Sequence, residues 1–206
     1  YYDTVYDKVV EKANQGTDSV WIRRASDGTT ELTEYALPAN VENGTILGTE
    51  DFDLTGNALG NVLLGNDGGN TLAGDDGADT LNGGDGFDRL RGGGGNDNYE
   101  LTDVTTKLFQ GPVFSFGDTV YDEVTEAADE GIDTVRVQRA ADGAEVRTGY
   151  TLRNNVENGQ ILGFEDFDLT GNTLNNVLTG NVGANTLAGG DGADTAGCSA
   201  AGGGGA

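Results

Sequence analysis

The sequence predicts an all-β fold in which short parallel strands stack as a solenoid, and two periodicities support it. Residues 65–99 form four consecutive nine-residue units, glycine-rich at the start, with a large apolar residue at the eighth place. A longer period runs through the whole chain: Asp3 recurs as Asp118, an offset of 118 − 3 = 115, and the match continues to Thr195. Self-similarity at a fixed period is the sequence signature of repeat architectures.

The nine-residue period has a physical explanation. Glycines allow the first six residues to turn tightly, including through positive φ. The last three residues then form a short strand whose apolar residue points inward, at Leu72, Leu81, Leu90 and Tyr99. Two units make one coil, so every second unit stacks on the same edge of the solenoid. A flexible Gly/Asp linker, which composition alone allows, does not require an apolar residue at every ninth position.

The units follow the template G-G-x-G-x-D-x-U-x, where U is a large apolar residue, with Asp79, Asp88 and Asp97 at the sixth place. The pattern resembles the RTX family, the haemolysin-type calcium-binding nonapeptide repeats. This resemblance implies a right-handed parallel β-roll with calcium-binding turns. It also implies a large secreted bacterial protein exported by type I machinery through a C-terminal signal.

Calcium prefers six to eight oxygen ligands from carboxylates and backbone carbonyls. We expect the best site between the turns of Asp79 and Asp97, which lie two units apart on one edge, and the next between those of Asn70 and Asp88 on the other edge. The predicted metal-binding set comprises the sixth-place residues and the glycines and carboxylates of the same turns: Asp79, Asp88, Asp97, Asn70, Asp194, Gly74, Asp76, Gly77, Gly83, Asp85, Gly86, Gly92, Gly95 and Asn185.

The early units of each block are degenerate at the sixth place. Asn61 and Asn70 stand where Asp belongs in the first block, and Asn176 and Asn185 precede Asp194 in the second. Asparagine supplies an oxygen but no charge. These turns are therefore expected to bind calcium weakly or to be held by hydrogen-bonded asparagine stacking.

Each 115-residue copy begins with an irregular segment outside the nonapeptide pattern. After an acidic opening that suits a loop or one short helical turn, alternating apolar residues predict strands at Ser19–Arg23 and Thr134–Gln138. Asp27-Gly28 and Asp142-Gly143 are turn signals for a hairpin or an outward excursion. We expect these segments to continue the same right-handed coil with wider rungs. Their core candidates are Val41, Ile46, Leu47, Val156, Ile161 and Leu162.

The predicted organisation has five parts. They are repeat one at 1–100 (irregular β segment 1–55, nonapeptide block 56–100), an insert at 101–117, repeat two at 118–195 (irregular segment 118–170, block 171–195) and a Gly/Ala tail at 196–206. The insert carries Phe109, Phe114 and Phe116, and it predicts a strand pair or cap, or else an adhesive patch. The tail breaks the repeat after Thr195, which leaves Asp194 without the following rung.

Composition limits the function classes. The chain has 35 Asp and Glu against 11 Lys and Arg, a net charge of −24, which argues against nucleic acid and anionic membrane as partners. The single cysteine, Cys198, rules out an internal disulfide framework. No apolar run is long enough for a membrane-spanning helix, and no N-terminal signal is visible. The sequence holds no histidine and no phosphate-binding glycine motif, so we expect no enzyme activity.

Two function classes remain. The first is a calcium-binding structural or adhesive module of a secreted bacterial surface protein: a filament, sheath, surface layer or adhesin whose partners are calcium and other copies of itself or neighbouring repeats. The second is the secretion and folding portion of a secreted enzyme or toxin whose catalytic domain lies elsewhere. Tandem copying lengthens a rod and adds no active site, which favours the first.

Overall fold

The computed structural model describes residues 9–13, 16–23, 33–101, 122–138 and 148–198, and all regular structure within them is β-strand. The longest sheet contains β1 (Ser19–Arg23), β3 (Asn43–Leu47), β5 (Val62–Leu64), β7 (Thr80–Asn82), β9 (Asn98–Leu101), β11 (Thr134–Val137), β13 (Asn158–Ile161), β15 (Val177–Gly180) and β17 (Thr195–Cys198). A second sheet contains β2 (Glu34–Ala36), β4 (Asp53–Thr55), β6 (Thr71–Asp76), β8 (Arg89–Gly94) and β10 (Glu123–Val124). A third contains β12 (Gly149–Thr151), β14 (Asp168–Thr170) and β16 (Leu187–Ala188).

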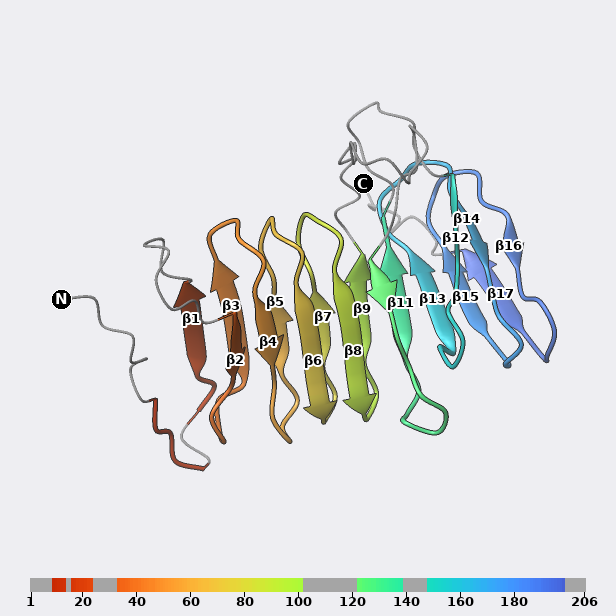
Figure 1. Ribbon diagram of the computed structural model, residues 1–206. Helices are drawn as coiled ribbons and strands as arrows, with labels where there is room; N and C mark the ends of the chain where they lie inside the picture. Colours follow the sequence, from red (N-terminus) through yellow and green to blue (C-terminus); the bar gives the residue numbers. More distant parts are fainter. Residues whose placement is uncertain (1–8, 14–15, 24–32, 102–121, 139–147, 199–206) are drawn as a thin grey trace, which may run out of the picture.

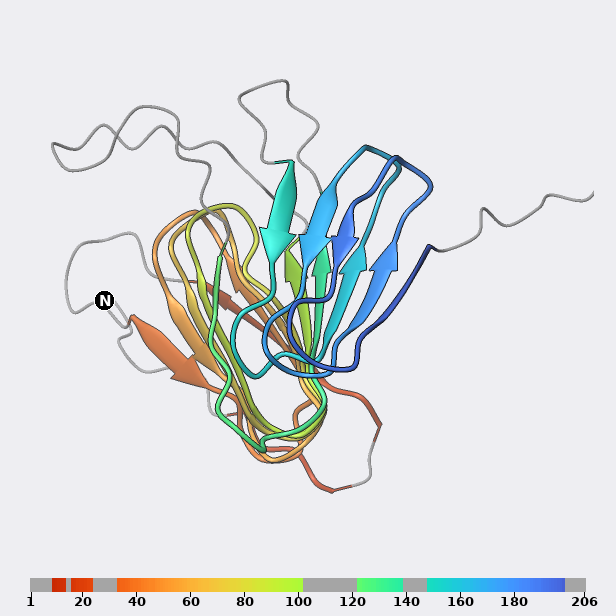
Figure 2. The same ribbon diagram turned by 90° about the vertical axis from the view of Figure 1, so that its right-hand side faces the viewer.

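Consecutive strands alternate between the long sheet and one of the two shorter sheets, and every pairing is parallel. In the nonapeptide block, Val62 pairs with Thr80, a step of 80 − 62 = 18 residues, or two units per coil. The coils stack side by side from β1 to β17 (Figure 1), and in the view turned by 90° those of the first repeat superpose as nested loops (Figure 2). The predicted all-β parallel roll is confirmed.

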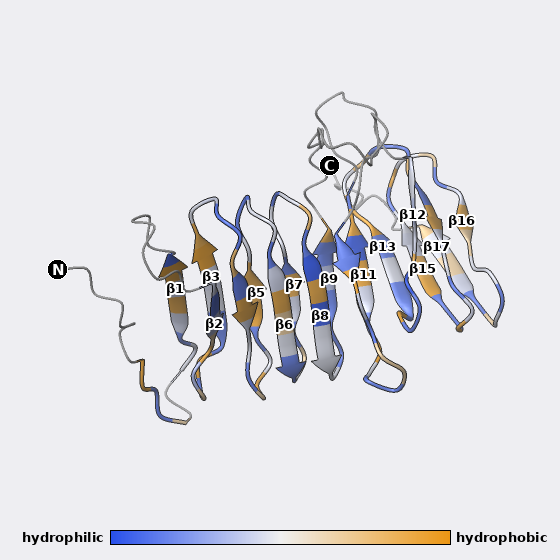
Figure 3. Ribbon diagram, viewed as in Figure 1, coloured by the Kyte–Doolittle hydropathy of each residue, from blue (hydrophilic) through white to orange (hydrophobic). Residues whose placement is uncertain are grey.

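Inward-facing residues stack in columns between the sheets. Leu63, Leu81 and Tyr99 are paired neighbours in the long sheet, and each is fully buried. Leu72 and Leu90 form the matching column in the second sheet. Apolar bands accordingly line up across neighbouring strands (Figure 3). The eighth-place apolar residue of each full unit in the first block is therefore a core residue, as predicted.

The irregular segments form wider coils of the same solenoid. Ser19 pairs with Asn43, a step of 43 − 19 = 24 residues, and Asn98 pairs with Thr134 across the boundary of the two copies, a step of 134 − 98 = 36 residues. The strand predicted at 19–23 forms, and the one predicted at 134–138 ends one residue earlier. The helical turn considered for the acidic opening does not occur among its described residues.

Two core predictions are wrong. Ile46 and Ile161 are buried, but Leu47 is 37% exposed and Leu162 is only half-buried, because adjacent residues of an extended chain point to opposite faces. The core position that sequence reasoning missed is Gly44, which lies in the same column as Leu63. A side chain on Gly44 would meet the Leu54 and Leu37 methyl groups at 2.8 and 3.1 Å, so these leucines fill the space. Gly159 is packed in the same way by Leu169 and Leu152.

Several expectations lie outside the described residues: both hairpin turns, nearly all of the insert, and the tail beyond Cys198. At the end of the described chain, the break predicted after Thr195 does not end the sheet, since β17 continues to Cys198 in register with β15. Its residues are exposed, and Ala196 stands where earlier units carry leucine. Within the described ranges, no helix has the length or apolar character needed to cross a membrane.

Candidate metal centres

The sixth-place residues of alternate units meet along each edge of the roll. On one edge, the backbone N–H of Asn61 donates to Asp79 Oδ1 at 2.6 Å, and the N–H of Asp79 donates to Asp97 Oδ1 at 2.8 Å. On the other edge, the N–H of Asn70 donates to Asp88 Oδ1 at 2.6 Å. The structure therefore brings together both pairs that the nonapeptide spacing predicts.

The second oxygen of these aspartates faces back into its own turn. A side chain on Gly74 would collide with Asp79 Oδ2, and one on Gly92 would collide with Asp97 Oδ2. Both oxygens are buried and accept no hydrogen bond. Buried carboxylate oxygens are normally paired with hydrogen-bond donors or metal ions, so each turn presents an acceptor that suits a cation.

The aspartate turns share a backbone conformation that the asparagine turns lack. The second and fourth residues of every aspartate turn have positive φ, at Asp75 and Gly77, Gly84 and Gly86, Gly93 and Gly95, and Gly190 and Gly192. No second- or fourth-place residue of the asparagine turns at 56–61, 65–70, 171–176 or 180–185 does. The Asp/Asn difference at the sixth place thus accompanies a change in the whole turn.

The asparagine turns satisfy their own side chains. Asn61 Oδ1 accepts from the N–H of Asn57 at 2.7 Å, and its amide nitrogen donates to the carbonyls of Val41 and Glu42, both at 3.1 Å. Asn70 likewise accepts from a backbone N–H at 2.8 Å and donates to a carbonyl of the preceding coil at 2.9 Å. The asparagines are hydrogen-bonded, as one of the two predicted alternatives has it, but to backbone groups of their own turn and of the preceding coil. In these turns the side-chain NH₂ group donates to backbone carbonyls, a role that a cation would take in an aspartate turn.

Burial has a clear electrostatic consequence at the aspartate turns. Desolvation raises the pKa of Asp79 to about 6, with the nearby Asp97 charge adding to the effect. The pKa of Asp97 is raised as well, mainly by desolvation. Both shifts arise because a negative charge is held away from water without an opposing charge. A divalent cation supplies that charge, so these residues fit calcium.

The remaining predicted ligands take several positions. Gly77, Gly86 and Gly95 hold the positive φ of the fourth place, and Gly83, like Gly74 and Gly92, leaves room for a carboxylate of its own turn. Asp76 is exposed, and Asp85 is half-buried.

In the second repeat, Asp194 is half-buried and accepts from the N–H of Asn176 at 2.9 Å. Asn185 Oδ1 accepts from the N–H of Asn181 at 2.9 Å, and its amide donates to the Phe167 carbonyl at 2.9 Å. Calcium ligation by the individual residues of the predicted set stays a prediction.

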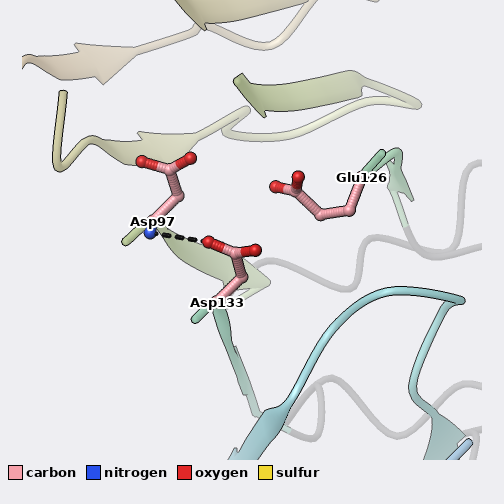
Figure 4. A group of neighbouring side chains, drawn as sticks. All are labelled: Asp97, Glu126 and Asp133. Carbon is pink, nitrogen blue, oxygen red and sulfur yellow. Dashed lines mark hydrogen bonds between the residues drawn. The ribbon is translucent and has the colours of Figure 1, made fainter. Parts of the chain in front are cut away.

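Sequence reasoning missed the carboxylates that follow the last nonapeptide turn. Asp133 Oδ1 accepts from the N–H of Asp97 at 2.9 Å, and Asp97, Glu126 and Asp133 each place one oxygen within 4.8 Å of the others (Figure 4). Asp133-Thr134-Val135 repeats the Asp-Thr-apolar order of Asp79-Thr80-Leu81, and that similarity could have identified Asp133. Glu126 carries no such signal.

The comparison with protein families agrees with the geometry. The model of the RTX calcium-binding nonapeptide repeat matches in four copies, over residues 55–90, 64–99 and 170–196. These ranges contain the aspartate turns and asparagine turns of both repeats. The curated proteins and the solved structures compared with the chain gave no match.

Proposed function

Because the chain carries calcium-binding nonapeptide repeats of the RTX family, we propose that it is a calcium-stiffened structural module of a secreted bacterial surface protein, such as a filament, sheath, surface layer or adhesin. RTX repeats bind calcium and are typical of secreted proteins. The structural role, the surface location and association with further copies are the proposed part. The module itself performs no catalysis in this proposal.

The observation that carries the proposal is the continuity of the long sheet across the boundary between the copies. β9 of the first repeat pairs with β11 of the second over four residue pairs, from Asn98–Thr134 to Leu101–Val137. The column of buried residues continues there, from Tyr99 to Val135. A second copy therefore lengthens the solenoid by continuing the same sheet. Such growth by stacking suits a rod.

Calcium would stiffen the roll at the aspartate turns, where buried negative charges repel one another. The net charge of −24 opposes a condensed chain, and Asp79 and Asp97 each bury a carboxylate oxygen that accepts no hydrogen bond. Asp79 and Asp97 would hold the ion between successive coils, with backbone carbonyls of the glycine-rich turns as further ligands. The asparagine turns would keep part of the coil formed at low calcium.

Calcium-dependent circular dichroism of the protein tests the first half of the proposal. We expect β-structure to decrease in excess chelator and to return with millimolar calcium, the range of many extracellular calcium modules. Magnesium at the same concentration is the matched control, because it demands octahedral geometry and retains its water ligands. An identical spectrum in chelator and in calcium would contradict the proposal.

Electron microscopy of the native parent protein, with and without calcium, tests the structural role. Extended rods in calcium that lose their stiffness in chelator are the expected result. Monodisperse globules in calcium, from a parent chain with a protease, lipase or other catalytic domain, would instead support the secretion and folding portion of an enzyme or toxin.

A further inference from the structure

The boundary between the two 115-residue copies contains a carboxylate cluster that the nonapeptide pattern does not describe. The turn of residues 92–97 is followed on its edge by residues 126–133, which open the second repeat. This segment is fixed on the turn by backbone hydrogen bonds: the N–H of Gly95 donates to the Glu130 carbonyl at 2.6 Å, and that of Thr134 donates to the Asp97 carbonyl at 2.8 Å. The two copies therefore contribute to one rigid junction.

Three carboxylates converge at this junction, and none of them forms a salt bridge with a described Lys or Arg side chain. Asp97, Glu126 and Asp133 are 1%, 7% and 1% exposed, and each has one carboxylate oxygen within 4.8 Å of the others; Figure 4 shows the Glu126 carboxylate pointing toward the two aspartates. Asp97 Oδ2 and Glu126 Oε2 are buried and accept no hydrogen bond. Oxygens this buried and unpartnered, on carboxylates that repel one another, point to a bound cation rather than to a solvated acidic patch.

Tyr99 gives Glu126 a fixed orientation. It stands at the eighth place, where the other full units of the first block have leucine, and its hydroxyl reaches Glu126 through the core. The hydroxyl donates to Glu126 Oε1 and accepts from the N–H of Gly92 at 2.5 Å. One oxygen of Glu126 is thereby occupied, and Oε2 remains available to the cluster. Tyr99 is a positioning residue in this arrangement.

The described part of the first copy contains a related opening segment. The 115-residue offset relates Glu126 to Glu11 and Asp133 to Asp18. The scaffolds agree: the N–H of Asp133 donates to Glu157 at 2.9 Å, and that of Asp18 donates to Glu42 at 2.8 Å. The Asn155 and Asn40 amides likewise donate to the Glu126 and Glu11 carbonyls at 2.9 and 3.2 Å. No described residue supplies a counterpart of Asp97 to Glu11 and Asp18.

We propose that Asp97, Glu126 and Asp133 bind a divalent cation, calcium by their ligand chemistry, and that this ion joins one 115-residue repeat to the next. The inference rests on the proposed function in assuming that calcium is available to the module. Its distinctive ligand is Glu126, which comes from the irregular segment and not from a nonapeptide turn.

Calcium titration by isothermal calorimetry of the full chain tests the junction site, with Glu126→Gln as the variant and Glu11→Gln as the matched control. Glu126→Gln keeps the shape of the side chain and removes a buried charge, so the variant is expected to fold. We expect it to bind one calcium ion fewer per chain, or to bind one ion at least tenfold more weakly. Glu11→Gln should retain the stoichiometry of the unmodified chain.

Terbium luminescence gives a second reading, because terbium replaces calcium at oxygen sites and accepts energy from a nearby tyrosine. Excitation of tyrosine should give less terbium emission in Glu126→Gln than in Glu11→Gln, since Tyr99 contacts Glu126. Equal stoichiometry, affinity and emission in the two variants would overturn the junction site while leaving calcium binding by the repeats intact. Absence of any calcium binding by the unmodified chain would instead overturn the proposed function.

Discussion

Replacing Asp79 with alanine should remove calcium-dependent stability, whereas the equivalent change at Asn61 should not. Asp79 contributes in two ways. Its Oδ1 accepts the Asn61 N–H at 2.6 Å, and its Oδ2 is a buried oxygen without a hydrogen-bond partner. The hydrogen bond to a charged acceptor is worth about 1.5–3 kcal/mol whether or not calcium is present. The unpartnered oxygen costs desolvation free energy in the metal-free protein and becomes a favourable ligand only when a cation is bound.

The calcium-dependent part follows from mass action. An ion that binds only the folded state stabilises it by RT ln(1 + [L]/Kd), which is about 2.7 kcal/mol at a concentration one hundred times Kd. Asp79→Ala should therefore lose about 2.7 kcal/mol of the calcium increment for each ion whose ligand it removes. Asn61→Ala loses hydrogen bonds to the Asn57 N–H and to two carbonyls, none of which involves calcium.

Urea unfolding followed by far-ultraviolet circular dichroism measures both parts. Each variant is unfolded in chelator and in saturating calcium, and the difference between the two free energies is its calcium increment. Both variants should be less stable in chelator than the unmodified chain, but only Asp79→Ala should have a reduced increment. Equal increments for the two variants would show that the sixth-place aspartate is not a ligand.

Three further predictions concern the backbone, the core and pH. Gly95→Ala should destabilise the roll in the same unfolding assay by more than the cost of a strained backbone conformation, about 1–3 kcal/mol. Gly95 has φ +134°, and an added methyl group would also collide with a carbonyl of the preceding coil. Gly94→Ala is the control and should cost less, because its methyl group would meet only a flexible side chain, at 3.0 Å. Leu81→Ala should cost about 2–5 kcal/mol because Leu81 is fully buried, and the 38% exposed Leu64 provides the control; similar losses at both sites would contradict the assigned core. Burial raises the pKa of Glu126 from 4.5 to about 7. The metal-free protein should therefore lose stability as pH rises through this interval, because the folded state holds the Glu126 proton more tightly than the unfolded state. A plot of the urea midpoint against pH, measured in chelator, should be flatter over this interval for Glu126→Gln.

The periodic part of the structure could be predicted from the sequence because its determinants are local. A nine-residue unit contains its own turn, strand and core residue, so two units close a coil and their sixth-place residues meet on one edge. Asp79 and Asp97 could therefore be paired before any coordinates were known, and the hydrogen bond from the Asp79 N–H to Asp97 Oδ1 confirms that they are neighbours. Asparagine at Asn61 and Asn70 also indicated correctly that the early turns differ from the later ones.

The irregular coils required the tertiary structure. Their strands were predictable from alternation, but the face of each strand was not, since a shift of one residue exchanges the buried and exposed sides. Ile46 is buried and Leu47 exposed for that reason, and Gly44 is a core position only because Leu54 and Leu37 pack over it. No periodicity in the sequence reports such contacts.

The junction cluster of Asp97, Glu126 and Asp133 was also predictable only in part. The fixed nine-residue spacing places Asp97 on a known edge, but the next strand of that sheet begins at Thr134, 36 residues after its partner Asn98. The path of the intervening chain decides which carboxylates reach Asp97, and the sequence carries no period that specifies it. Sequence alone therefore determined the fold, its repeat and the aspartate turns, because their spacing is built into each unit. Only the tertiary structure could place Glu126 beside Asp97 and Asp133, because their proximity depends on how two separate repeats stack.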